Sequence, residues 1–85
     1  MISVLLVDDQ NLIRQGLKAL LELEPDLKIV GEAENGKQAV ELVEQLQPNV
    51  VLMDIRMPLM DGVAATREIK NKFAQTKILV LTTFE

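Results

Sequence analysis

Short apolar runs alternate with segments of helical periodicity along the chain. Ile2–Val7 is almost continuously aliphatic, which is typical of a strand buried on both faces of a parallel sheet. Comparable runs occur at Leu27–Ala33, Asn49–Met53 and Lys77–Thr83. The pattern therefore predicts four strands. The last one is apolar throughout its centre, so we expect it to be covered on both sides.

Each of the three intervening segments has a mostly apolar face at helical spacing, which we expect to be buried. These positions are Ile13, Leu17, Leu20 and Leu21 in the first segment, Ala39, Val40, Leu42, Val43 and Leu46 in the second, and Val63, Thr66, Ile69 and Phe73 in the third. Pro25 and Pro48 end the first two segments, and Asp61 is the predicted N-cap of the third.

The dipeptide Asn35-Gly36 can be interpreted in two ways. Between apolar runs it signals a hairpin turn. The helical spacing that follows favours Asn35 as the residue that introduces a helix. The predicted order is then βαβαβαβ, which implies right-handed crossovers and a mostly parallel, doubly wound α/β sheet.

Acidic residues stand where two of the predicted strands end. Asp8 and Asp9 follow the first strand and Asp54 follows the third, while Thr82 lies near the end of the fourth. Parallel strands end at one edge of the sheet, where ligands bind. Two carboxylates about 4 Å apart repel by roughly 4 kcal/mol at an effective dielectric near 20, so such a cluster needs a cation, a shared proton or separation.

The ligand chemistry favours Mg²⁺ as that cation. Oxygen ligands without histidine or cysteine select a hard ion, and Mg²⁺ is usual where a phosphate shares the site. Simpler interpretations remain open for most of these residues. Asp8 and Asp9 could cap the following helix, and Thr82, like its neighbour Thr83, is a common strand residue. Asp54 has fewer alternatives, because a carboxylate that closes a buried strand is costly without a partner.

Composition limits the class of protein. The chain has 85 residues and 48% apolar content with 2% aromatics, which indicates one small domain. Either its core is dense and aliphatic, or part of its apolar surface is covered by something outside this chain. A net charge of −4 without a basic cluster argues against direct nucleic-acid binding. The absence of cysteine excludes disulfides. No basic leader and no apolar stretch of about 18 residues is present, so a cytoplasmic protein is expected.

Several motifs together resemble the receiver domain of two-component response regulators. They are Val7-Asp8-Asp9, Met53-Asp54, Met57-Pro58, Asp61-Gly62 and Leu81-Thr82. The segments Glu32–Gly36, Asp54–Pro58 and Leu81–Phe84 resemble the LuxR/NarL-type subgroup. The resemblance implies a flavodoxin-like sheet with strand order 2-1-3-4.

The resemblance also implies roles for individual residues. Asp54 would be the phosphoacceptor, and Thr82 would be the switch hydroxyl that turns toward the phosphoryl group. Asp9 would bind Mg²⁺ directly and Asp8 through water, with further oxygens from Asp54 and the backbone carbonyl of Arg56. A sensor histidine kinase would be the phosphoryl donor. DNA would be bound only through a C-terminal helix-turn-helix domain, and the receiver would catalyse its own phosphorylation without being a turnover enzyme.

Receivers have a lysine at the end of a fifth strand, beyond the region that this chain covers. We therefore expect residues 1–85 to be a partial receiver domain without the fifth strand and the last two helices, and with an impaired switch. A homodimer or a domain-swapped oligomer remains open. The alternatives are a non-signalling structural fragment and, less favoured, an aspartyl-phosphate phosphatase, in which a second aspartate would stand at the position of Arg56.

Overall fold

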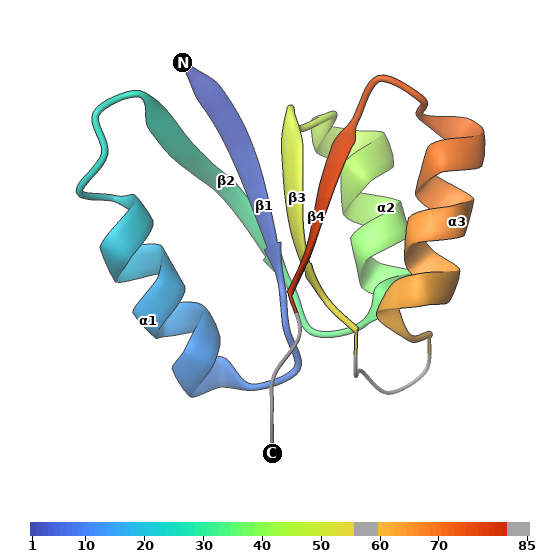
Figure 1. Cartoon of the computed structure of the whole chain (residues 1–85), viewed down its shortest axis with the longest axis horizontal. Coiled ribbons are helices and arrows are strands. Elements are labelled where there is room, and N and C mark those ends of the chain that lie inside the picture. Colours follow the sequence, from blue (N-terminus) through green and yellow to red (C-terminus); the bar gives the residue numbers. More distant parts are fainter. Residues whose placement is uncertain (56–59, 82–85) are drawn as a thin grey trace.

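The computed structural model describes residues 1–55 and 60–81. Their fold is a four-stranded parallel sheet with strand order β2-β1-β3-β4, as predicted (Figure 1). The strands are β1 (Ile2–Val7), β2 (Leu27–Ala33), β3 (Val50–Asp54) and β4 (Lys77–Leu81). The helices are α1 (Asn11–Leu21), α2 (Gly36–Leu46) and α3 (Gly62–Lys72). In this part of the chain, no helix is long and apolar enough to cross a membrane.

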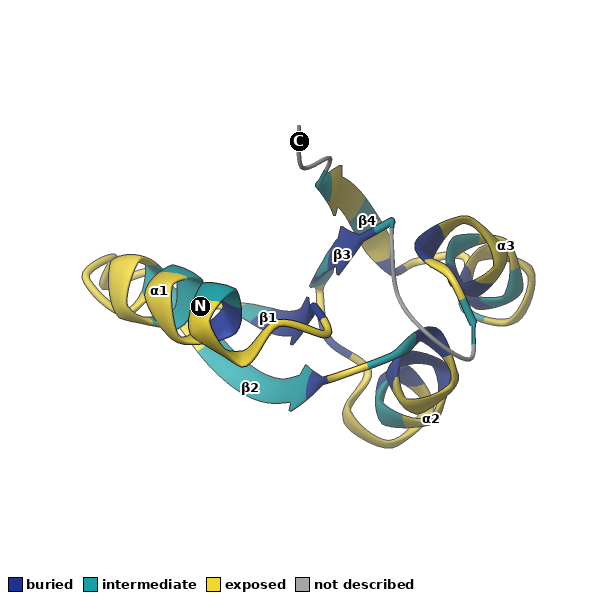
Figure 2. Ribbon diagram, turned by 90° about the horizontal axis from the view of Figure 1, so that it is seen from below, coloured by how far each residue is buried: buried dark blue, intermediate teal, exposed yellow. Residues whose placement is uncertain are grey.

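The helices cover the two faces of the sheet unequally. Figure 2 shows α1 on one face, against β1 and β2, and α2 together with α3 on the other. The strand order explains this arrangement, because the sheet grows from β1 in opposite directions and right-handed crossovers then place helices on opposite faces.

The main core lies between the sheet and the pair α2 and α3. Alternate side chains of the central strands β1 and β3 point into it, and small and aliphatic residues of the two helices fill the space between them. The fully buried members are Leu5, Val7, Ala33, Val51, Met53, Ala39, Val43, Ala65 and Ile69. The dense aliphatic core that the composition allowed is therefore present.

Side-chain caps fix where two helices begin. The Asn35 side chain accepts a hydrogen bond from the Gln38 amide at 2.8 Å, so the hairpin interpretation of Asn35-Gly36 is wrong. Asp61 accepts one from the Ala64 amide at 2.8 Å, which confirms it as an N-cap. At the other end of α2, Gln47 is left-handed with φ 46°.

The strand boundaries differ slightly from those predicted. β3 runs from Val50 to Asp54 rather than from 49 to 53, because Asp54 still pairs with Leu81. Asn49 instead accepts hydrogen bonds from the Ser3 amide at 2.8 Å and the Ser3 hydroxyl at 2.9 Å, and so joins the beginnings of β1 and β3. The predicted end of β4 at residues 82–83 lies outside the described residues.

One position in each of two predicted helix stripes is exposed. Leu20 is 65% exposed and Val63 is 53% exposed, whereas the other predicted positions of these two stripes are buried or half-buried. Arg14 is the buried residue of α1, and α3 buries Gly62, Ala65 and Ile69. Periodicity gives the spacing of a stripe, but neighbouring elements select which side of it faces inward.

β4 is less covered than expected. Its residue Leu79 is 52% exposed on the face that carries α1.

A close approach at Gly62 leads to the first testable prediction. The Gly62 amide donates to the Ile55 carbonyl at 2.8 Å, and a Cβ at Gly62 would overlap the backbone carbonyl of Asp54. Gly62→Ala should lower the free energy of unfolding by about 1–3 kcal/mol, because backbone must move. Gly16→Ala is the matched control, since a Cβ there meets nothing within 4 Å.

The control should be stabilised by up to about 1 kcal/mol, from helix propensity. Urea unfolding followed by far-ultraviolet circular dichroism measures both variants. A Gly62→Ala chain as stable as the Gly16→Ala chain would show that the loop after β3 is not held in this way.

Candidate metal centre

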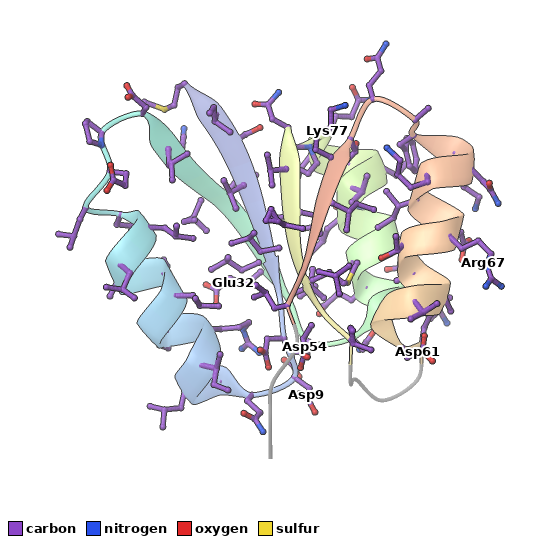
Figure 3. The ribbon with its side chains drawn as sticks, in the orientation of Figure 1. Asp9, Glu32, Asp54, Asp61, Arg67 and Lys77 are labelled. Carbon is purple, nitrogen blue, oxygen red and sulfur yellow. The ribbon has the colours of Figure 1, made fainter. Side chains whose placement is uncertain are left out.

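Three carboxylates meet at the carboxyl edge of the sheet. Asp8 follows β1, and Asp54 ends the neighbouring β3, with Val7 paired to Met53 just before them. One carboxylate oxygen each from Asp8, Asp9 and Asp54 lies within 4.8 Å of the others. Figure 3 shows Asp9 and Asp54 together below the ends of the strands. The predicted convergence of these residues is therefore confirmed.

The three acids differ in their exposure to water. Asp8 and Asp54 are only 2% and 5% exposed, whereas Asp9 is exposed. A cation that reaches the cluster from solvent would thus meet Asp9 at the rim and the two buried carboxylates behind it. Asp54 makes further interactions within the fold.

Asp8 is held by the backbone on both sides. Its amide donates to the Ala33 carbonyl at 3.1 Å, and its Oδ1 accepts from the Gln10 amide at 2.8 Å. The N-cap of α1 is Gln10, which makes no side-chain cap. The interpretation of Asp8 and Asp9 as helix caps is therefore wrong, and the side chain of Asp8 instead orders the turn before the helix.

The environment of Asp8 disfavours its charged form. Burial is the largest influence and raises the pKa of Asp8, and repulsion by Asp54 and Asp9 acts in the same direction. The Gln10 hydrogen bond and the positive charge of Arg14 lower the pKa but do not cancel the rise. A bound cation would relieve this cost. The all-oxygen donor set suits a hard ion, so the residues present fit Mg²⁺.

Two other predicted site groups, the backbone carbonyl of Arg56 and the hydroxyl of Thr82, lie outside the described residues. Met57 and Pro58 lie outside them as well. Leu81, the last described residue of β4, pairs with Asp54.

One cationic residue next to the cluster was missed by the sequence analysis. Arg14 is 8% exposed, and its Nη1 donates to the Asp8 carbonyl at 2.6 Å. Its Nε donates to Glu32 on β2 at 3.2 Å. In the sequence, the only sign that Arg14 is buried is its position beside Ile13 and three residues before Leu17, which places a basic residue next to the apolar stripe of α1.

With this fold and this acidic cluster, the family assignment is direct. The chain belongs to the response regulator receiver domain family, whose sequence profile matches residues 4–85. It is 48% identical over 84 residues to the transcriptional regulatory protein LiaR of Bacillus subtilis (strain 168), an alignment that covers 99% of this chain and 40% of LiaR.

Two further similarities agree with this assignment. A LuxR-family two-component response regulator from Aurantimonas sp. SI85-9A1 superposes with a TM-score of 0.94 at 32% identity, covering 100% of this chain and 61% of that one. A protein-glutamate methylesterase/protein-glutamine glutaminase 2 of Photobacterium profundum is 47% identical over 81 residues, which are 95% of this chain and 20% of that protein. The receiver resemblance and its LuxR type are confirmed.

The raised pKa of Asp8 leads to a prediction for stability against pH. A carboxyl whose folded pKa is raised contributes stability below its unfolded pKa of about 4, and this stability is lost as pH rises through the folded pKa. Asp8→Asn keeps an acceptor for the Gln10 amide and removes the charge. Without metal at pH 7, it should be more stable by about 1 kcal/mol, or about 4–8 °C in Tm.

Thermal unfolding in EDTA at pH 4 and pH 7 checks this expectation. The gain should be present at pH 7 and shrink toward pH 4. Asp61→Asn is the control, because asparagine is an equally good N-cap and Asp61 lies outside the cluster. An Asp8→Asn chain that is no more stable than the wild type at pH 7 would contradict the prediction.

Proposed function

We propose that this receiver accepts a phosphoryl group on the carboxylate of Asp54, with Mg²⁺ bound by the acidic cluster. The observation that carries the proposal is the convergence of Asp8, Asp9 and Asp54 at the carboxyl edge of a receiver-type sheet. Parallel sheets of this type bind their ligands at that edge.

The chemistry is a phosphoryl transfer between two side chains. A carboxylate oxygen of Asp54 attacks phosphorus in line, the new P–O bond forms as the P–N bond of a phosphohistidine donor breaks, and the imidazole leaves with the electron pair. Burial holds the Asp54 side chain at the end of β3, so the attacking oxygen is already placed. When bound, Mg²⁺ neutralises the charge shared by the donor phosphate and the carboxylates.

Each further group has a proposed part in this site. Asp9 would hold the ion directly and Asp8 through water, while Asp54 and the Arg56 carbonyl would supply further oxygens. Thr82 donates its hydroxyl to the bound phosphoryl group and so reports its presence. The acidic cluster and the family support this scheme, while Arg56 and Thr82 enter it from the motif resemblance alone.

The partners follow from the family. A sensor histidine kinase in the cytoplasm is the proposed donor, and a transcriptional output that binds DNA through a C-terminal helix-turn-helix domain is the proposed effector. The support is the similarity to LiaR, which is a transcriptional regulatory protein. The chain spans about 40% of LiaR. We propose that residues 1–85 are part of a receiver domain and that the transcriptional output lies in another domain of the whole protein.

We further propose that the receiver is phosphorylated without turning over an external substrate. The methylesterase relative is matched over only 20% of its length, so its activity does not transfer with the shared segment. Arg56 also stands two residues after Asp54, where a phosphatase of the aspartyl-phosphate type would place a second aspartate.

Intact-mass spectrometry after incubation with acetyl phosphate and Mg²⁺ tests the proposal. One phosphoryl group should be added to the wild-type chain, and none to Asp54→Asn or to the wild type in EDTA. Asp9→Asn should slow the reaction at least about tenfold, because a metal ligand is lost. Asp61→Asn should react like the wild type. Equal phosphorylation of the wild type and Asp54→Asn would overturn the assignment of the acceptor.

A further inference from the structure

Arg14 is a buried cation with a partner for each of its guanidinium nitrogens. Nη1 donates to the Asp8 carbonyl at 2.6 Å, Nη2 to the Asn11 side chain at 3.0 Å, and Nε to the Glu32 carboxylate at 3.2 Å. Arginine is rarely buried, and burial of its charge is costly unless it is paired and hydrogen-bonded. Because each nitrogen of the guanidinium donates a hydrogen bond, Arg14 constrains the groups that it contacts.

Those groups belong to three separate parts of the fold. Asp8 lies in the turn after β1, Asn11 begins α1, and Glu32 lies on β2, beside Leu6 of β1. Glu32 is itself anchored a second time, by Lys18 Nζ at 3.6 Å. Arg14 thus fastens the β1–α1 turn to the helix that follows and to the neighbouring strand.

The turn that Arg14 holds is the one that carries two of the acids. Only residues 8–10 separate β1 from α1. The amide of Asp8 donates to the Ala33 carbonyl and its carbonyl accepts from Arg14, so the backbone is fixed on both sides of the Asp8 side chain. The orientation of the peptide group between Asp8 and Asp9 then sets where Asp9 projects.

We propose that Arg14 is a positioning residue for the metal centre: its hydrogen bond to the Asp8 carbonyl holds the Asp8-Asp9 turn in the arrangement that binds the divalent cation. This inference rests on the proposed function of the acidic cluster. The planar geometry of the guanidinium, rather than its charge, is what holds the turn in place.

Charge and geometry predict opposite effects on metal affinity. The positive charge of Arg14 repels a cation bound nearby, so its removal would strengthen Mg²⁺ binding if only Coulomb forces mattered. Loss of the hydrogen bond to Asp8 would weaken binding by misplacing the carboxylates. Lysine keeps the charge but cannot reproduce the planar fork that reaches Asp8, Asn11 and Glu32 together.

The test is titration of the folded chain with Mg²⁺ alone, followed by ¹H–¹⁵N NMR shifts, which reports Kd independently of stability. Arg14→Lys should raise Kd about tenfold. Arg14→Met should also raise Kd, but by less, because loss of the positive charge partly offsets loss of the hydrogen bonds. Ile69→Val, a change in the core that is fully buried away from the acids, should lower stability and leave Kd unchanged. Unchanged or tighter binding in both Arg14 variants would overturn the inference.

Two further measurements keep the outcomes separate. If the Arg14 variants do not fold, Glu32→Ala replaces them, because it removes the acceptor of Arg14 Nε and should raise Kd; Glu32→Gln, which keeps a neutral acceptor, is its control. Equal Kd values in Glu32→Ala and Glu32→Gln would then count against the proposal. If the wild type and Asp9→Asn bind Mg²⁺ equally, the proposed metal centre fails; if only the Arg14 and Glu32 variants match the wild type, the positioning role alone fails.

Discussion

Repulsion among three carboxylates at one edge of the sheet is the constraint on which the rest of this structure depends. Asp8, Asp9 and Asp54 present oxygens within 4.8 Å of one another, and two of the three are almost fully buried. Without a cation, the fold must hold these groups together against their charge. Burial raises the pKa of Asp8 most, and repulsion by Asp54 and Asp9 raises it further, so the charged form of Asp8 is disfavoured. A divalent ion at this cluster would relieve that repulsion and would gain affinity from it.

Different interactions hold the two strands that carry the acids. β3 is fixed by the main core, where Val51 and Met53 pack against α2 and α3 without exposure to water. Close backbone approaches extend this rigidity beyond Asp54: Gly62 donates to Ile55, and Gly36 donates to the Met60 carbonyl at 2.9 Å. Glycine is required at both positions, since a Cβ would overlap backbone atoms. Asp54 therefore stands on a rigid base formed by apolar packing.

On the other face of the sheet, polar contacts contribute more to holding the elements together. α1 covers β1 and β2 alone, and Leu79 on β4 remains half-exposed on that face. Arg14, Glu32 and Lys18 connect α1 to β2, and Arg14 also reaches the backbone beside the acids. Hydrogen-bond geometry is directional, whereas apolar packing is not, so this face can set the orientation of the Asp8-Asp9 turn. The acidic site thus combines a packed strand end with a hydrogen-bonded turn.

The sequence by itself determined the element order, the parallel sheet and the position of the acids at strand ends. Continuous aliphatic runs, the caps at Asn35 and Asp61, and the receiver motifs are all local signals that neighbouring residues carry together. Tertiary structure decided where the buried faces of α1 and α3 end, so that Leu20 and Val63 are exposed while Arg14 is buried. It also decided that Arg14 pairs with Glu32, which lies 18 residues further along the chain, on β2. Periodicity fixes spacing within one element, but the rotation of a helix and a contact between distant residues depend on how separate elements pack.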